Sequence, residues 1–388
     1  MKWKSKLAEA GLMVFPLSLG LPMPLIYKSI ALGLFCLITA IYFLAMPKAY
    51  RRWPKYSLHY VFIMVFLAVT ITTLIRDGYL FFDETRLSFL VLPLVMPLGS
   101  KLIRQYSDQI LKAFLLGVLF YIGYAIVYVI YFYGWYNPAK TFSFDYYLKY
   151  VLYHYMPGAI HHTYMGLFLT FSMAVVLEIK TIKTGLKIPA ILLLCASMPL
   201  IGSKWTLFAG IAVLGFWATK NYYNKARVWI IALITIFSIA LLWAGTVTDL
   251  FRTFNQSLQK RIQLLQCSLE AAGEHWFLGM GKDSVKPWME SCTEANLAMD
   301  THNIFLQELL TSGIFALLIL LFILTKLFRR SSNCFLFSAF CGLILFYGLI
   351  EHLFNLQLGV TFFVFFSVLF LELSSAKSKG KLIETSRK

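Results

Sequence analysis

The chain has 388 residues, of which 59% are hydrophobic, 17% are aromatic and 14% are charged, and its formal net charge is +17. Soluble domains carry about 25% charged residues, so this composition excludes an ordinary soluble domain. Apolar runs long enough to cross the ~30 Å hydrocarbon core of a bilayer recur along the chain. We therefore predict an all-α, polytopic membrane protein with a single transmembrane domain over residues 1–388.

Hydropathy predicts about twelve transmembrane helices. They are expected near residues 8–25, 29–46, 58–75, 86–99, 110–134, 162–178, 186–201, 205–219, 228–246, 304–325, 335–350 and 356–373. The N-terminal stretch is basic and then apolar, as in a signal peptide, but no clear small-residue cleavage site follows it. We interpret it as an uncleaved first helix.

Lysine and arginine are unevenly distributed between the connections of these helices. One set of connections, which includes both termini, holds most of them, and the positive-inside rule places that set in the cytoplasm. The long connections 135–161 and 247–303 then lie on the opposite side, the second as a large helical loop between the ninth and tenth helices. Topology thus explains most of the positive charge, and no nucleic-acid partner is predicted.

The stretch MDTHNIFLQELLTSG begins the tenth predicted helix. Asp300 or Thr301 is expected to cap that helix, because polar side chains satisfy the unpaired N–H groups of a first turn. The cap leaves His302 unexplained. An imidazole at the depth of the lipid headgroups can accept a proton near neutral pH, so His302 is a candidate catalytic residue, with Asn303 beside it as a candidate substrate contact.

Four basic residues lie outside the cytoplasmic set, at positions where the positive-inside rule does not explain their charge. Lys204, in LIGSKWTLFAG, either extends its ammonium group to the membrane surface or binds an anion such as a lipid diphosphate. Arg252, Lys260 and Arg261 belong to a segment with helical periodicity. That segment is either an interfacial helix on anionic lipid or a phosphate-binding element, for which the Arg261 guanidinium is well suited.

The sixth predicted helix begins in a region rich in aromatic residues. His161, His162 and Tyr164 start this helix much as His302 starts the tenth. Aromatic residues gather at membrane interfaces, and they also stack on sugar rings. Both an aromatic belt and a carbohydrate-contacting surface fit the pattern.

The large loop contains a cysteine pair and a glycine pair. Cys267 and Cys292 would form a disulfide in an oxidising compartment, or else remain two free thiols. Gly279 and Gly281 indicate a tight turn, because a phosphate-binding loop would need a preceding strand and a third glycine. No His, Cys or Asp spacing indicates a metal site, and no cofactor is predicted.

Several of these motifs together resemble the O-antigen ligase and polymerase superfamily, most closely its lipopolysaccharide O-antigen ligases. The resemblance rests on the His-Asn helix start with a glycine about ten residues later, and on RIQLLQCSLEAAGEHWFLGMGKDS, an arginine-led helix ending in a Gly-x-Gly turn. IGSKWTLFAG and HHTYMGLFLTF are similar to two further helix starts of that family. Lys204 stands where the family usually has arginine, so it keeps the charge but loses the bidentate fork.

The resemblance implies a metal-independent glycosyltransferase in the bacterial inner membrane, with both termini cytoplasmic and its active face periplasmic. Such an enzyme moves a polysaccharide from undecaprenyl diphosphate to a hydroxyl of lipid A–core, so its partners are these two lipids within the membrane. His302 would then be the general base that activates the acceptor hydroxyl, and Arg261 and Lys204 would neutralise the departing diphosphate.

Three other functions remain open at this point. A polymerase of the same superfamily uses nearly the same chemistry on a different acceptor. A transporter or flippase of two six-helix halves usually has a long cytoplasmic centre and charges at the membrane midplane, whereas the central connection here, EIKTIKTGLK, is short. A structural scaffold would leave Lys204, Arg261 and His302 without a role.

Overall fold

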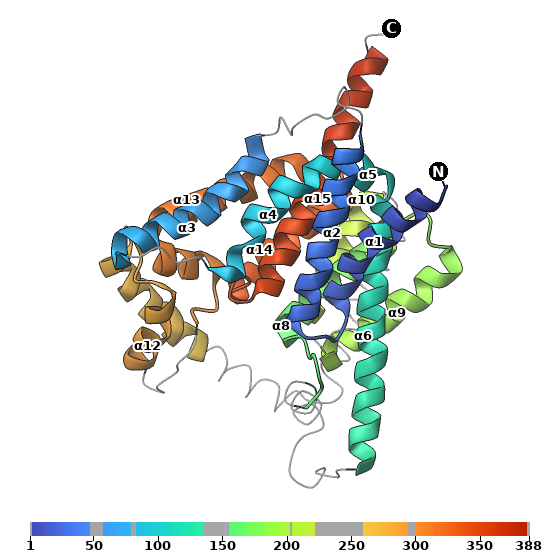
Figure 1. The fold of residues 1–388 in the computed structure, drawn as a ribbon. Coiled ribbons are helices and arrows are strands. Elements are labelled where there is room, and N and C mark those ends of the chain that lie inside the picture. Colours follow the sequence, from blue (N-terminus) through green and yellow to red (C-terminus); the bar gives the residue numbers. More distant parts are fainter. Residues whose placement is uncertain are drawn as a thin grey trace.

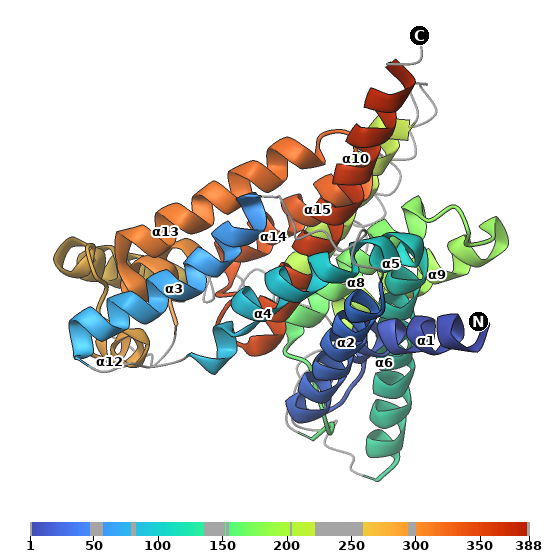
Figure 2. The ribbon, with the colours of Figure 1, turned by 45° about the horizontal axis from the view of Figure 1, so that its top comes forward.

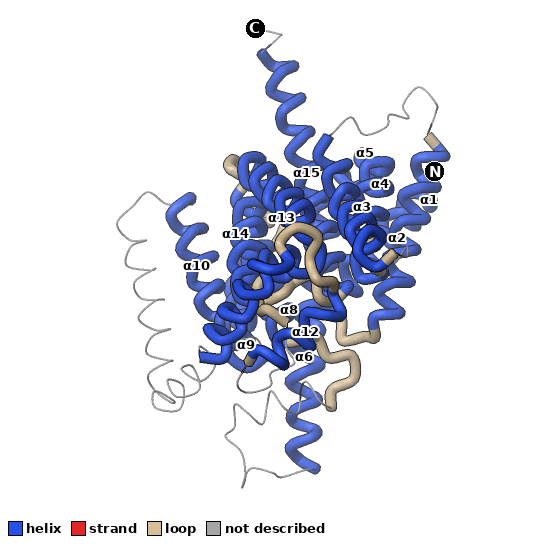
Figure 3. The backbone as a smooth tube through the Cα atoms, turned by 90° about the vertical axis from the view of Figure 1, so that its left-hand side faces the viewer, coloured by secondary structure: helices blue, strands red, loops and turns tan. Residues whose placement is uncertain are grey.

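A computed structural model describes the protein over residues 2–46, 57–78, 83–135, 152, 155–201, 204–221, 259–293 and 300–385. These residues form helices joined by turns, and this part of the chain contains no strand (Figure 3). The all-helical prediction is therefore confirmed for the described residues.

The helices coincide with eleven of the predicted segments, while the ninth, near 228–246, lies outside the described residues. Their bounds are α1 Lys2–Gly20, α2 Leu25–Ala45, α3 Ser57–Asp77, η2 Glu84–Arg86, α4 Ser88–Val95, η3 Met96–Gly99, α5 Ser100–Gln105, α6 Ser107–Trp135, α8 His162–Glu178, α9 Thr184–Ile201, α10 Lys204–Asn221, α12 Lys282–Cys292, α13 Ile304–Ser331, α14 Phe335–Ile350 and α15 Gln357–Thr385. The predicted segment 86–99 is divided into short helices. Pro93 lies inside α4, and α4 ends two residues before Pro97, which lacks the N–H that a continuous helix needs.

Six of these helical segments are long and apolar enough to cross a membrane, and five shorter apolar helices accompany them within the described residues. Many large apolar side chains on their outer faces are exposed, as on α2, where Ile26, Ile30 and Leu37 are more than half exposed. Such faces suit a lipid environment, in which apolar side chains need no protein partner. The arrangement fits a polytopic membrane protein.

Two helices form the centre of the bundle. Every residue of α8 from Thr163 to Leu177 is buried, and α15 buries nearly all of its side chains from Leu358 to Leu371. A helix that is apolar on all sides is typical of a protein core or of a membrane span, and both of these helices are buried by the helices around them. In Figures 1 and 2, α15 runs between the α3–α13 pair and the group that contains α1, α2 and α6.

An outer segment packs against one end of this bundle. It consists of the helix at residues 259–275, a turn and α12, drawn in yellow-brown beside α3 and α13 in Figure 1. The buried face of this segment contains Leu264, Ala271, Val285 and Met289, which form a small core together with Leu310 of α13. The part of the large loop that the structure describes is therefore folded against the bundle.

Candidate functional site

The candidate site forms where the first residues of α8 and α13 meet the connection between α14 and α15. Asn303 caps α13, because its side-chain oxygen accepts hydrogen bonds from the N–H groups of Phe305 (2.9 Å) and Leu306 (3.1 Å). The predicted helix start is correct, but the cap is Asn303 rather than Asp300 or Thr301. The Asp300 carboxylate instead accepts a hydrogen bond of 2.5 Å from the side chain of Asn355.

His302 has an unusual backbone conformation directly before this cap. Its φ angle is +50°, and it is the one residue other than glycine with a positive φ in the described part of the chain. This conformation costs free energy for a side chain with a Cβ atom. The hydroxyl of Thr301 bonds to the carbonyl of Asn303 at 2.8 Å, and the N–H of Thr301 bonds to the side chain of Gln307, so the surrounding segment is held in place.

The His302 ring is paired with a carboxylate from the other side of the site. Its Nδ1 atom lies 2.9 Å from Oε1 of Glu351, which follows the last residue of α14. The other carboxylate oxygen, Oε2, accepts a hydrogen bond of 3.1 Å from the hydroxyl of Thr163 in the first turn of α8. Three separate segments of the chain therefore meet at the Glu351 side chain.

Arg261 comes to the same point from the outer segment. Its Nη1 atom donates a hydrogen bond to the carbonyl of Ile350, the residue before Glu351. Within the described residues this carbonyl is its only hydrogen-bond acceptor, although a guanidinium has five N–H donors. The predicted pair of Arg261 and His302 is thus brought together across a two-residue segment that the sequence prediction did not include.

The charges of the site favour an ionised Glu351. Burial alone would raise the pKa of this carboxyl, but the hydrogen bond and charge of His302 and the nearby ring of His161 hold it at about 2. Burial lowers the pKa of Arg261, and the Glu351 carboxylate opposes that effect. At neutral pH the site therefore contains an anion between a guanidinium and two imidazoles.

Two further predicted residues, Tyr164 and His161, lie at the start of α8 with different surroundings. The Tyr164 ring is buried, and its hydroxyl donates to the carbonyls of His352 and Leu353 at 3.2 Å each. These hydrogen bonds hold the turn that follows Glu351. His161 precedes α8, with its ring centroid 4.1 Å from that of His162 and the two ring planes tilted by 42°. Its charge acts on Glu351.

The other predicted basic residues are Lys204, Lys260 and Arg252. Lys204 is the first residue of α10, and the neighbouring Thr206 packs against Gly166 of α8. The start of α10 therefore lies beside the first turns of α8. Lys260 is exposed, and Arg252 lies outside the described residues.

The helix at 259–275 has the amphipathic character that the sequence predicted. Ile262, Leu265 and Leu269 form an exposed apolar stripe, whereas Leu264 and Ala271 are buried against α12 and α13. Arg261 lies between these two faces and is partly buried. The helix can therefore rest on the bundle with one face and present its apolar stripe to the membrane interface.

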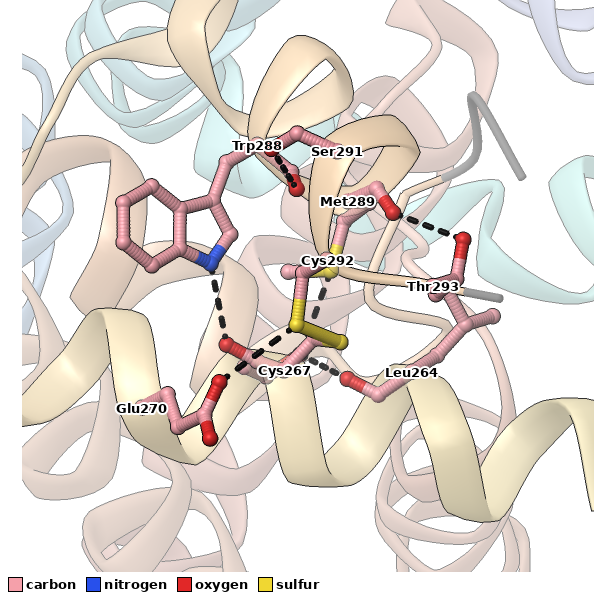
Figure 4. Close-up of a disulfide and its surroundings, with 9 residues drawn as sticks. Leu264, Cys267, Glu270, Trp288, Met289, Ser291, Cys292 and Thr293 are labelled. Atoms are coloured by element: carbon pink, nitrogen blue, oxygen red, sulfur yellow. Dashed lines mark hydrogen bonds between the residues drawn. A yellow bond between two sulfur atoms is a disulfide. The ribbon is translucent and has the colours of Figure 1, made fainter. Parts of the chain in front are cut away.

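A disulfide joins this helix to α12. The Cα atoms of Cys267 and Cys292 are 5.9 Å apart and their sulfur atoms are bonded. Figure 4 shows the bond together with the indole of Trp288, which donates a hydrogen bond of 3.2 Å to the carbonyl of Cys267. The two cysteines thus fix Arg261, six residues from Cys267, to the rest of the outer segment.

The Gly-x-Gly turn of the outer segment packs against α13. Gly279 and Gly281 have φ angles of +74° and +93°, as expected for the predicted tight turn. Gly313 interrupts α13 with a φ of +76°, and the turn fits against this break. The N–H of Met280 bonds to the carbonyl of Leu310 at 2.6 Å, and the N–H of Ile314 bonds to the carbonyl of Trp276 at 2.9 Å.

A second cluster of charges lies buried next to the site. The Arg86 guanidinium forms a bidentate pair with Glu308, at 2.5 and 2.8 Å, and both side chains are almost completely buried. Arg86 also lies 3.3 Å from Asp83, which is 3.5 Å from Lys282 at the start of α12. These pairs attach the outer segment to the bundle and balance one another in charge.

Sequence reasoning missed Glu351, Arg86 and Glu308. Glu351 lies in GLIEHLFNLQLG, and an acidic residue beside a histidine between two apolar helices could have indicated it. Glu308 lies within the apolar run of the tenth helix, where a carboxylate needs a partner. The partner is more than two hundred residues away, so the run by itself did not indicate which residue it is.

Comparison with known proteins supports the family that the motifs indicated. Residues 189–321 match the family model described as O-antigen ligase. The matched region includes Lys204, Arg261, His302 and both bonded cysteines. The match covers about a third of the chain and supports the O-antigen ligase and polymerase superfamily that the sequence motifs indicated. A search of curated proteins finds no match to the chain.

Proposed function

We propose that the protein is a metal-independent glycosyltransferase of the bacterial inner membrane that works as an O-antigen ligase. In this proposal it spans the membrane about twelve times, with both termini in the cytoplasm and the loop 247–303 in the periplasm. It transfers a polysaccharide from undecaprenyl diphosphate to a hydroxyl of lipid A–core. The observation that carries the proposal is that Arg261 and His302 both bond to the segment Ile350–Glu351. Arg261 and His302 lie inside the region matched by the O-antigen ligase family, and Ile350–Glu351 lies after it in the sequence.

The reaction joins the acceptor oxygen to C1 of the donor sugar and breaks the bond between C1 and the diphosphate oxygen. The electron pair of the broken bond leaves with the diphosphate, so negative charge develops on that oxygen. Arg261 and Lys204 supply positive charge there, and preorganised cations stabilise such a transition state. Nε2 of His302 takes the proton of the acceptor hydroxyl, a contribution typically worth about 10²–10⁴ in rate.

The arrangement of the site suits two lipid-linked substrates. The outer helix carries Arg261 on the border between its buried face and its exposed apolar stripe. An arginine on such a border lies at the depth of lipid headgroups when the stripe rests in the interface. A diphosphate attached to a membrane lipid lies at the same depth, so the donor can reach Arg261 and His302 without leaving the membrane.

Complementation of a ligase-deficient Gram-negative strain tests the proposal. Wild type should restore attached polysaccharide on lipopolysaccharide gels, whereas His302→Ala, Arg261→Ala and Lys204→Ala should not, at equal membrane levels. Lys286→Ala removes a charge from the exposed side of α12 and should behave as wild type. Extension of a polymer that is never attached to lipid A–core would identify a polymerase instead, and full transfer by His302→Ala would refute the role of His302.

A further inference from the structure

Glu351 has no assigned role, and it lies thirty residues beyond the region matched by the family. Each of its two carboxylate oxygens has a protein partner: Nδ1 of His302 at 2.9 Å and the hydroxyl of Thr163 at 3.1 Å. The N–H of His352 also points to Oε1, at 3.3 Å. The side chain is about one-eighth exposed, so protein groups rather than water determine its orientation.

These contacts determine which nitrogen of His302 bears the proton. An ionised carboxylate can only accept hydrogen bonds, so the Nδ1 atom that faces it must carry hydrogen. The lone pair of the neutral ring is then on Nε2, on the opposite side of the ring from Glu351. No described residue bonds to Nε2, and the His302 side chain is one-fifth exposed. The proton-accepting atom is therefore open to a bound hydroxyl.

Thr163 completes the arrangement from a third segment. Its hydroxyl binds Oε2, so the carboxylate plane cannot rotate freely and Oε1 stays directed at His302. Thr163 belongs to the buried start of α8. Through Glu351, it therefore holds the His302 imidazole in a defined position relative to the centre of the bundle. The positive φ of His302 is consistent with a residue whose orientation is imposed by its contacts.

We propose that Glu351, oriented by Thr163, is a positioning residue that holds His302 in the tautomer with an open Nε2 and stabilises the imidazolium formed when His302 takes the acceptor proton. The inference rests on the proposed function of His302 as the base. In this role Glu351 acts through His302, to which its Oε1 atom is bonded, and not on the substrate itself. Among the described residues, the other charged or titratable groups that interact with it are His161, Arg261 and Tyr164.

Two measurements on the purified full-length protein test this role. The first is the rate of transfer against pH, with an undecaprenyl-diphosphate-linked glycan as donor and lipid A–core as acceptor. Glu351→Gln should lower the maximal rate by about 10-fold or more, up to the ~10²–10⁴ of a base itself. The acidic limb of its pH profile should move to lower pH, since the imidazolium loses its anionic partner. The KM for the donor should change little, because Arg261 remains.

Thr163→Val and Glu351→Asp test the role of Glu351 if Glu351→Gln folds poorly. Thr163→Val retains the charge and should lower the rate less than Glu351→Gln, without moving the acidic limb. Glu351→Asp also retains the charge and should recover part of the rate lost in Glu351→Gln. A Glu351→Gln protein with the wild-type rate and pH profile would overturn the proposal.

The second measurement does not depend on activity. Nitrogen-15 NMR of protein labelled at histidine, with His302→Ala used to assign the signal, should show the tautomer with hydrogen on Nδ1 in wild type. That preference should be lost in Glu351→Leu, whose side chain has no hydrogen-bond acceptor. The expected tautomer in a protein without transferase activity would support the positioning role and refute the proposed function. A wild-type ring with hydrogen on Nε2 would refute the positioning role even if transfer is observed.

Discussion

Met280 donates its backbone N–H to the carbonyl of Leu310 at 2.6 Å, within the last turn before Gly313 interrupts α13. This contact connects the outer segment, which carries Arg261, to the helix that begins beside His302. The two candidate catalytic residues thus belong to segments that are attached to each other at a second place. The break in α13 leaves backbone groups that the Gly-x-Gly turn satisfies, as any buried helix interruption requires.

Substitution of Gly313 should disturb the site from a distance. A Cβ atom at Gly313 would lie 2.0 Å from the carbonyl oxygen of Phe277, and the φ of +76° adds strain of about 1–3 kcal/mol. Gly313→Ala should therefore lower the thermal midpoint in detergent and reduce transfer. Gly342→Ala is the matched control, because Gly342 lies within α14 with open space around its Cβ position. Equal effects of the two substitutions would contradict this account.

The buried pair of Arg86 and Glu308 should behave as a unit. Arg86→Leu leaves the Glu308 carboxylate buried without its guanidinium, and loss of one partner of a buried pair costs about 3–5 kcal/mol of unfolding free energy. The double variant with leucine at both positions should lose much less, because no uncompensated charge remains between them. Thermal unfolding in detergent measures both, with Arg329→Leu on the exposed part of α13 as a control. If the stability lost by the double variant equals the sum of the losses in Arg86→Leu and Glu308→Leu, the pair is not coupled.

The disulfide should be present in the protein made in its native compartment. Cys267 and Cys292 should react with a maleimide only after reduction, whereas Cys334, which is partly exposed, should react without reduction in the unfolded protein. Serine at both positions removes a cross-link between residues 25 apart, which costs roughly 3 kcal/mol. Transfer should fall as well, because Arg261 is on the cross-linked helix. Labelling of both thiols before reduction would contradict the bond.

Glu351 should also make stability depend on pH. Its pKa in the folded protein, about 2, is below its ordinary value of 4.5. A lowered carboxyl pKa contributes stability that is fully present above 4.5 and is lost as the pH falls towards 2. The difference in thermal midpoint between wild type and Glu351→Gln should therefore be largest above pH 4.5 and should narrow in more acidic buffers. A constant difference would show that the Glu351 charge does not stabilise the fold.

The described helices were predictable from the sequence, and so were several residues of the candidate site. Long apolar runs fix where α2, α3 and α13 lie, because their length and composition are local properties. The polar start of α13 and the arginine-led helix were also visible as local patterns, and Arg261 and His302 both lie at the candidate site. The Gly279-x-Gly281 turn followed from its glycines alone.

The partners of these residues were not predictable in the same way. Glu351 meets His302 and Thr163 across separations of 49 and 188 residues, and only the packing of α8, α13 and α14 brings the three together. The contact of Gly313 with Phe277 likewise depends on how the outer segment folds back. The Asn303 cap was missed because Asp300, Thr301 and Asn303 are all good capping residues, and the alternative contact of Asp300 with Asn355 decides among them.

The central claim is that His302 is the base of a glycosyl transfer, and a defined reaction tests it most directly. Purified protein in lipid nanodiscs is given an undecaprenyl-diphosphate-linked glycan and lipid A–core in the presence of a metal chelator. The account predicts transfer by wild type and by Lys286→Ala, and a rate about 10²–10⁴ lower for His302→Ala at an unchanged thermal midpoint. A folded His302→Ala protein that transfers glycan at the wild-type rate would contradict it.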